Sequence, residues 1–159
     1  MSLPPFSTFL EEHRLPVLRY LTAAVGRDEA ADCFQETFLA ALRAYPRLEP
    51  GSNLTAWVFT IAHNKVVDAA RARTRRPVPV GAAAGDDEAA TLPDPTPATD
   101  GPLWQAVRAL PPKQRTAVVH RIVGDRPYAE IAAVLGCSED AARQSVSTGL
   151  RRLREELSR

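Results

Sequence analysis

Apolar residues recur every three or four positions along most of the chain, a spacing that predicts helices. The clearest case lies near the C-terminus, where two helical patterns meet at Gly136. The first runs from Tyr128 to Leu135, and Pro127 suits its first helical position. Gly136 favours a left-handed stop, and Ser138 is suited to cap the second helix. The second helix has a single apolar stripe, made of Ala142, Val146, Leu150, Leu153 and Leu157.

The outer face of this second helix is polar and basic. Its members are Gln144, Ser147, Thr148 and Arg151, with Arg143 and Arg152 on the flanks. A short helix, a turn containing glycine and a second helix with such a face form the helix-turn-helix pattern that enters the DNA major groove. An ordinary helical hairpin with a solvated outer face is the alternative interpretation.

Two helices are predicted in the first 45 residues. Residues 5–25 are amphipathic, and Pro16 is expected to kink this segment or to split it. Asp28 is suited to cap the next helix, which should end near Tyr45. Its predicted buried face is Ala31, Phe34, Phe38, Ala41, Leu42 and Tyr45. A second stripe on the other side is Asp32, Gln35, Glu36, Leu39 and Arg43, which by itself indicates only a solvated face.

A long helix is predicted from Asn53 to residue 76, capped by Ser52 or Asn53. One edge of this helix carries Trp57, Asn64, Asp68, Arg71 and Arg75. A tryptophan followed by amide and guanidinium groups along one edge suits base stacking and phosphate contact. The alternative is that Trp57 belongs to the core and that the arginines form a solvated helix end.

Residues 77–102 differ in kind from the rest of the chain. They hold six prolines and five acidic residues and show no apolar periodicity, which predicts a flexible linker. Residues 1–80 carry ten basic and eight acidic side chains, and residues 102–159 carry ten and six. We therefore expect an all-α protein with two separately folded modules: an N-terminal helical bundle domain (1–76), a flexible linker (77–101) and a C-terminal helix-turn-helix domain (102–159).

The composition argues against several other classes of protein. Cys33 and Cys137 are far apart and show no metal-ligand or disulfide spacing, which indicates a reducing cytoplasm. No secretory signal and no apolar run long enough for a membrane span is evident, so we expect a cytoplasmic protein without membrane insertion, metal or cofactor. Cys33 and His63 are the only conceivable nucleophile–base pair. A lone cysteine on a helix usually packs, so no enzyme is expected, and His120 and Cys137 are interpreted as structural.

The chain resembles the extracytoplasmic-function class of bacterial RNA polymerase sigma factors in three runs: DEAADCFQETFLAALRAY, NLTAWVFTIAHNKVVDAARARTRR, and LPPKQRTAVV followed by YAEIAAVLGCSEDAARQSV. These runs follow the family's order and cover nearly the whole chain outside the linker. The resemblance implies a non-enzymatic initiation subunit that binds core polymerase and directs promoter-specific transcription. A sigma-like regulator that binds DNA or polymerase without opening promoters is the alternative.

The resemblance also implies roles for the stripes. The N-terminal domain would dock on the clamp helices of the polymerase β′ subunit through Asp32, Gln35, Glu36, Leu39 and Arg43. The loop at residues 49–53 and the following helix would open the minus-ten element and capture bases through Asn53, Trp57, Asn64, Lys65, Arg71 and Arg75. The C-terminal domain would touch the β flap and read the minus-thirty-five element through Ser138, Arg143, Gln144, Ser145, Thr148 and Arg151. An anti-sigma factor is a further expected partner.

Two features qualify this expectation. The family usually has basic side chains where this chain has Ser145 and Thr148, and a Thr-Val pair where this chain has Ala141 and Ala142. These differences predict weak minus-thirty-five recognition. Residues 77–101 would span about 27 Å as a flexible coil and at most ~85 Å when extended. Promoter elements two helical turns apart are separated by roughly 70 Å, so the linker must be drawn out in the polymerase complex.

Overall fold

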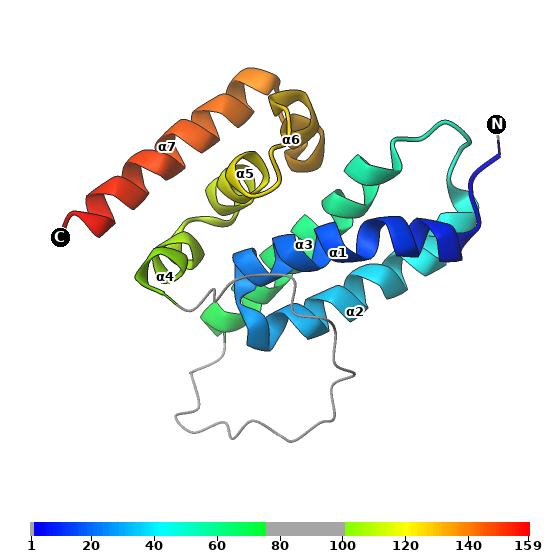
Figure 1. Ribbon diagram of the computed structural model, residues 1–159, viewed down its shortest axis with the longest axis horizontal. Coiled ribbons are helices and arrows are strands. Elements are labelled where there is room, and N and C mark those ends of the chain that lie inside the picture. The colour runs from blue at the N-terminus through cyan, green and yellow to red at the C-terminus, as the bar shows by residue number, and fades with distance from the viewer. Residues whose placement is uncertain (1, 76–100) are drawn as a thin grey trace.

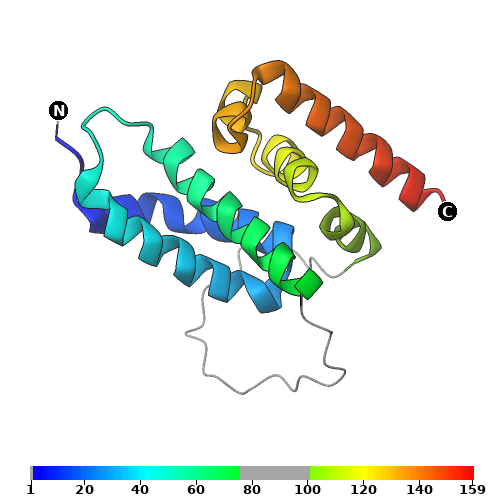
Figure 2. The ribbon, with the colours of Figure 1, turned by 180° about the vertical axis from the view of Figure 1, so that it is seen from behind.

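The computed structural model describes residues 2–75 and 101–159, without the side chains of Thr74 and Arg75. Within these ranges the chain forms only helices (Figure 1, Figure 2), as predicted for an all-α protein. They are α1 (Phe6–Val25), α2 (Arg27–Ala44), η1 (Tyr45–Arg47), α3 (Leu54–Arg75), α4 (Pro102–Ala109), α5 (Pro112–Ile122), α6 (Tyr128–Leu135) and α7 (Glu139–Leu157). None of these helices has the length and apolar character needed to span a membrane. Apart from Gly101, the predicted linker lies outside the described residues.

The N-terminal half is a bundle of α1, α2 and α3, which pack on one another. α1 contains Pro16 but is one helix, so the expected split does not occur. Proline removes one backbone hydrogen bond from a helix. Packing compensates for this loss, because His13 and Val17 on either side of Pro16 are both buried.

α2 differs from its predicted form at its start and on its buried face. Gly26, with φ of 85°, precedes the helix, and Asp28 lies in the first turn rather than at the cap. In the first turn its carboxylate is favoured by the helix dipole. The buried residues are Ala30, Cys33, Thr37, Phe38 and Ala41. Leu42, predicted to be in the core, is 49% exposed. The buried face is therefore rotated from the predicted one, and α2 packs on both α1 and α3.

The C-terminal half contains the predicted helix-turn-helix in α6 and α7. Gly136 ends α6 with φ of 64°, and the Ser138 hydroxyl accepts a hydrogen bond from the Ala141 backbone N–H at 3.1 Å, which confirms both predictions. Pro127 precedes α6 instead of occupying its first position. Of the predicted apolar stripe on α7, Ala142, Val146 and Leu153 are buried, Leu150 is half-buried and Leu157 is exposed.

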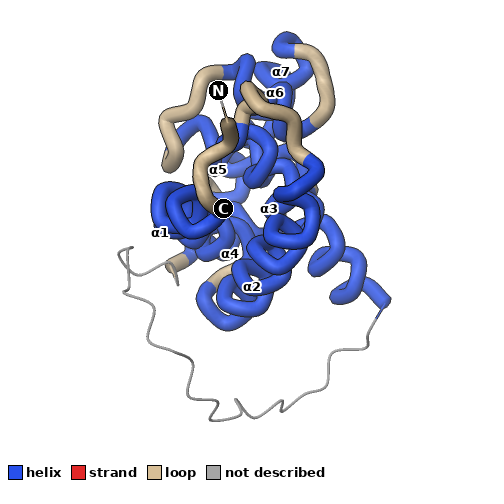
Figure 3. Tube along the Cα trace, turned by 90° about the vertical axis from the view of Figure 1, so that its right-hand side faces the viewer, coloured by secondary structure: helices blue, strands red, loops and turns tan. Residues whose placement is uncertain are grey.

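The two halves lie against each other along a seam. Helix α6 packs on α3, and α4 and α5 pack on α1 (Figure 3). The main hydrophobic core crosses this seam, and its members from the C-terminal half are Ala106, Val107, Leu110, Val118, Val119, Val134 and Leu153. A smaller apolar cluster lies within the helix-turn-helix. The predicted N-terminal bundle and C-terminal helix-turn-helix domain are both present, and they pack on each other, because apolar side chains of each half are buried by the other.

Candidate nucleic-acid and protein interfaces

The outer face of α2 is the first candidate interface. Its predicted members, Asp32, Gln35, Glu36, Leu39 and Arg43, are all exposed. Leu39 is 51% exposed, and Leu42 extends the same surface. Exposed leucines among charged side chains are typical of a protein-binding surface, because the apolar groups supply contact area and the charges select the partner. The sequence pattern predicted a buried Leu42 because its spacing also fits the apolar stripe of α2.

The predicted edge of α3 is the second candidate interface. Asn64 and Arg71 are exposed, and Lys65 is half-buried. Asn53 is the residue that caps the helix, since its Oδ1 accepts a hydrogen bond from the Ala56 backbone N–H at 3.1 Å. This cap fixes the first turn of α3 and so the direction of the loop that precedes it. Asn64 and Arg71 therefore lie on one side of a helix with a defined start, and Lys65 lies on its flank.

Trp57 lies between the core and the solvent. Its ring is half-buried, with centroids 5.7 Å from Phe9 and 6.2 Å from Tyr45. The core interpretation therefore accounts for part of this ring. A ring held by neighbouring aromatic side chains can stack on a base with little further loss of side-chain entropy. The side chain of Arg75 lies outside the described residues, so its role stays a prediction.

The outer face of α7 is the third candidate interface. Ser138, Arg143, Gln144 and Arg151 are exposed, whereas Ser145 and Thr148 are half-buried. Arg143 forms an ion pair with Glu139 at 3.0 Å, and its guanidinium lies 4.5 Å from the centre of the Tyr128 ring. Exposed ion pairs contribute little to stability, so a DNA phosphate could replace Glu139 as the partner of Arg143 at low cost.

Gly149 sets the distance between α7 and α5. A Cβ atom at this position would lie 2.6 Å from Cγ2 of Val118 and 3.6 Å from Cβ of Gln114. Glycine lowers helix propensity, but here only a hydrogen atom fits between the two helices. The close contact fixes the position of α7, and therefore of its outer face, on the rest of the half.

The conceivable nucleophile–base pair shows no sign of activation. Burial, followed by the carboxylates of α2, raises the pKa of the Cys33 thiol to about 11, so the thiol is protonated at neutral pH. The Nδ1 atom of His63 is hydrogen-bonded to Oγ1 of Thr116 at 2.9 Å. Among the described residues, no group of three or more His, Cys, Asp and Glu side chains could hold a metal ion. Cys33 and His63 therefore lack the features of an activated nucleophile–base pair.

Comparison with known proteins agrees with this geometry. Residues 9–76 match Sigma-70 region 2, and residues 100–153 match Sigma-70 region 4. The chain is 36% identical over 158 residues to the RNA polymerase sigma factor CarQ of Myxococcus xanthus, covering 96% of this chain and 88% of CarQ. It is 35% identical over 167 residues to the ECF RNA polymerase sigma factor SigD of Mycobacterium tuberculosis, covering 93% of this chain and 74% of SigD. The chain belongs to the extracytoplasmic-function (ECF) class of RNA polymerase sigma factors.

Two solved structures share the fold of this ECF sigma factor. The sigma factor RpoE in complex with the anti-sigma factor NepR from Bartonella quintana gives a TM-score of 0.73 at 24% identity, with 98% of each chain covered. CnrH in complex with the cytosolic domain of CnrY gives 0.67 at 23% identity, with 96% of this chain and 87% of CnrH covered. At these identities the likeness establishes the fold.

The sequence did not reveal the polar side chains that meet at the seam of the ECF sigma factor. Oγ1 of Thr116 lies 2.8 Å from the Tyr20 hydroxyl as well as 2.9 Å from His63 Nδ1. The ring of His120 stacks on Tyr20 with centroids 4.5 Å apart, which agrees with its predicted structural role. These contacts join α1, α3 and α5, and no local pattern in the sequence relates residues so far apart.

Proposed function

We propose that this ECF sigma factor binds core RNA polymerase through the outer face of α2 and promoter DNA through the outer faces of α3 and α7. In that complex it directs promoter-specific transcription initiation. The observation that supports these assignments most directly is exposure. All five predicted residues of α2 are exposed, as are Asn64 and Arg71 of α3 and four predicted residues of α7. The buried faces of the same helices hold each exposed face in place.

The α3 surface suits the capture of unpaired bases. Unstacking a base costs a few kcal/mol. Stacking on an aromatic side chain returns about 1–3 kcal/mol per base, and cationic groups add attraction to the phosphates. Trp57 supplies the ring, Asn64 an amide that can donate and accept, and Lys65 and Arg71 the positive charge. The sigma factor holds the opened strand, and bond formation belongs to the polymerase.

The α7 surface suits duplex DNA. Arginine and glutamine side chains near the start of a recognition helix can reach base edges and phosphates in the major groove. Arg143 and Gln144 occupy such positions and are exposed. Ser145 and Thr148 carry no charge, so the face makes fewer strong base contacts than a more basic helix would, each good bidentate pair giving about 1–3 kcal/mol. We expect weak discrimination at the minus-thirty-five element.

An anti-sigma factor is a further proposed partner, and the cytoplasm is the proposed place of action. Two proteins of the same fold have been solved in complexes, RpoE with the anti-sigma factor NepR and CnrH with the cytosolic domain of CnrY. The exposed leucines of α2 form a surface that a partner would cover. The cytoplasm is where RNA polymerase meets its promoters.

Reconstituted transcription tests the proposal. The purified chain is combined with core polymerase on fragmented genomic DNA, and the starts of the run-off transcripts are sequenced. We expect discrete promoter-dependent starts and permanganate-reactive thymines just upstream of them. Replacing both Asp32 and Gln35 by Ala should abolish polymerase binding, while Glu12→Ala, at an exposed position on α1, should not. Polymerase binding without transcripts or reactive thymines would instead indicate a regulator that does not open promoters.

Asn64→Ala separates the α3 assignment from polymerase binding. Because Asn64 is exposed, the substitution should leave the fold and the affinity for core polymerase unchanged. Permanganate reactivity should fall several-fold if the amide contacts the opened strand. Unchanged reactivity would remove Asn64 from the proposed DNA surface.

A further inference from the structure

The centre of the seam is a hydrogen-bonded hydroxyl group. Thr116 of α5 is fully buried, and its Oγ1 contacts the Tyr20 hydroxyl of α1 at 2.8 Å and Nδ1 of His63 of α3 at 2.9 Å. Tyr20 and His63 are themselves buried. A buried polar group that loses its partner is strongly disfavoured. The hydrogen bonds among Thr116, Tyr20 and His63 therefore stabilise the packed arrangement of the two halves, and they are lost when the halves separate.

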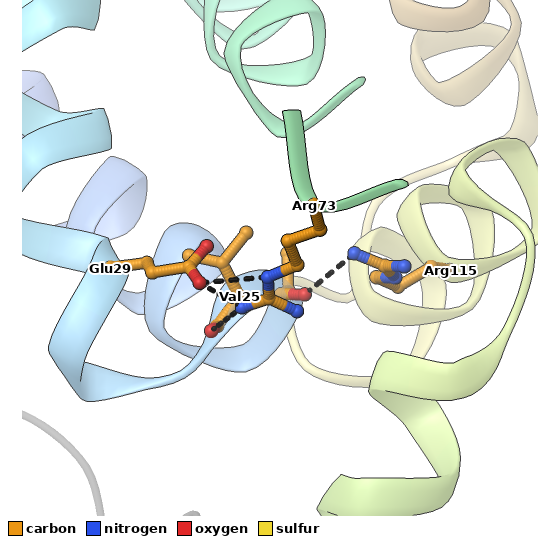
Figure 4. Close-up of polar contacts among 5 residues, drawn as sticks. Val25, Glu29, Arg73 and Arg115 are labelled. Atoms are coloured by element: carbon orange, nitrogen blue, oxygen red, sulfur yellow. Dashed lines mark hydrogen bonds and ion pairs between the residues drawn. The ribbon is translucent and has the colours of Figure 1, made fainter. Parts of the chain in front are cut away.

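Arg115, the neighbour of Thr116, ties α5 to the end of α1. Its Nη1 donates to the carbonyl of Ala24 at 3.0 Å (Figure 4). Its Nη2 donates to the carbonyl of Leu110 at 3.1 Å. From the N-terminal half, Arg73 donates to the next carbonyl, Val25, at 3.5 Å, and pairs with Glu29. The last carbonyls of a helix lack partners within it and attract cations. Each half thus supplies one arginine to the same helix end.

Aromatic contacts close the seam beside the hydrogen bonds of Thr116. The His120 ring is nearly parallel to Tyr20, with an interplanar angle of 15°, and forms a T-shaped contact with Phe59, the ring centroids being 4.8 Å apart. The guanidinium of Arg126 covers the same Phe59 ring at 4.9 Å. We call Tyr20, His63, Arg115, Thr116 and His120 the seam latch. Its members come from α1, α3 and α5, so separation of the halves breaks every one of these cross-seam contacts.

The packed arrangement conflicts with binding to two promoter elements at once. A compact chain of 159 residues has a radius of gyration of about 15 Å, and so a diameter of roughly 40 Å. Promoter elements two helical turns apart are separated by roughly 70 Å. Helix α6 also covers one side of α3, where Thr55, Ala56 and Phe59 line a space shared with Ile131 and Val134. The two DNA-binding halves must separate to contact both elements.

We infer that the seam latch holds the free sigma factor in a closed state, and that core polymerase binds productively only the fraction of molecules in which this latch has opened. This inference rests on the proposed function, since it concerns the same polymerase complex. Because only the open state binds, the apparent affinity for polymerase is reduced by the fraction of molecules that are open. Weakening the latch therefore raises affinity, whereas ordinary structural damage lowers it.

The test compares buried threonines. Thr116→Val removes the hydroxyl that bridges the halves and leaves Tyr20 and His63 without this partner. Thr37→Val is the matched control, because Thr37 is equally buried but its hydroxyl donates only to Cys33 within α2. Affinity of the full chain for core polymerase is measured without DNA. We expect Thr116→Val to bind roughly tenfold more tightly than Thr37→Val, because leaving buried groups unpaired shifts the closed-to-open ratio by at least that factor.

A second pair of substitutions makes a smaller change, so that misfolding does not decide the result. Tyr20→Phe removes one hydroxyl at the seam and keeps the ring that stacks on His120. Its control is Tyr45→Phe, where the lost hydroxyl donates to the Pro4 carbonyl within the N-terminal half. We expect Tyr20→Phe to bind polymerase several-fold more tightly than Tyr45→Phe. Equal or weaker binding by both seam variants, relative to their controls, overturns the latch. Absence of binding by the unaltered chain would instead overturn the proposed function.

Discussion

Gly149 illustrates how a single missing side chain positions a helix. Replacing it by Ala should improve helix propensity by about 1 kcal/mol, yet the new Cβ would meet Val118 at 2.6 Å. Overpacking of this kind costs about 1–3 kcal/mol, so we expect Gly149→Ala to lower the free energy of unfolding. Urea denaturation measures the change. Ser147→Ala, at an exposed position on the same helix, should be neutral or slightly stabilising, and a stabilised Gly149→Ala would show that the contact can relax.

His120 makes the stability depend on pH. Burial, with smaller effects of Arg126 and His63, lowers the pKa of His120 to about 3 in the folded chain, against 6.5 ordinarily. Below pH 6.5 the unfolded chain binds a proton that folded His120 does not. Stability is therefore lost as the pH falls from about 6.5 towards 3, by about 2 kcal/mol at pH 5. Burial and the charge of Lys113 also lower the pKa of His63, which acts in the same direction.

Urea denaturation of a His120→Phe variant at pH 7, 6 and 5 measures this contribution. The Nε2 atom of His120 is buried without a hydrogen-bond partner, and a cavity of about 200 Å³ adjoins the ring, so phenylalanine should be tolerated. We expect the variant to lose less stability between pH 7 and pH 5 than the unaltered chain. A pH dependence identical to that of the unaltered chain would show that His120 is not the group responsible.

At the level of a single helix, Leu39 tests whether the outer face of α2 binds polymerase. Leu39→Asp on α2 should leave the thermal midpoint nearly unchanged, because the side chain is 51% exposed. It should reduce affinity for core polymerase at least tenfold, since buried apolar anchors dominate protein interfaces. Leu157→Asp, at a leucine of α7 that is 50% exposed, is the matched control. Equal losses of affinity for the two variants would argue against a specific α2 interface.

Helix boundaries and caps were largely predictable, whereas the orientation of α2 was not. Ser138, Gly136 and Asn53 act through neighbours within four residues in sequence, so the local pattern identifies them. The rotation that exposes Leu42 depends on where α1 and α3 pack on α2, and the periodicity within α2 carries no information about that. The predicted binding stripes were recognised because polar residues repeat on one helix face, but their roles came from the resemblance.

At the scale of the whole molecule, the shared core predicts cooperative unfolding. The chain has one tryptophan in each half, Trp57 and Trp104, and both pack against the core that crosses the seam. In the variants Trp104→Phe and Trp57→Phe, fluorescence therefore reports one half at a time. We expect coincident urea midpoints for the two halves, because neither buries its seam residues alone. Two clearly separate midpoints would show that the halves unfold independently.

Spacing and motifs along the chain were enough to predict the helices, several of their caps, the helix-turn-helix and the family, because each of these depends on residues within one stretch of chain. The shared core of the two halves, and the meeting of Tyr20, His63 and Thr116 within it, became apparent only from the folded arrangement. These contacts join residues 53 and 96 positions apart. Their stabilisation depends on packing and burial in three dimensions, and the order of residues along the chain does not record it.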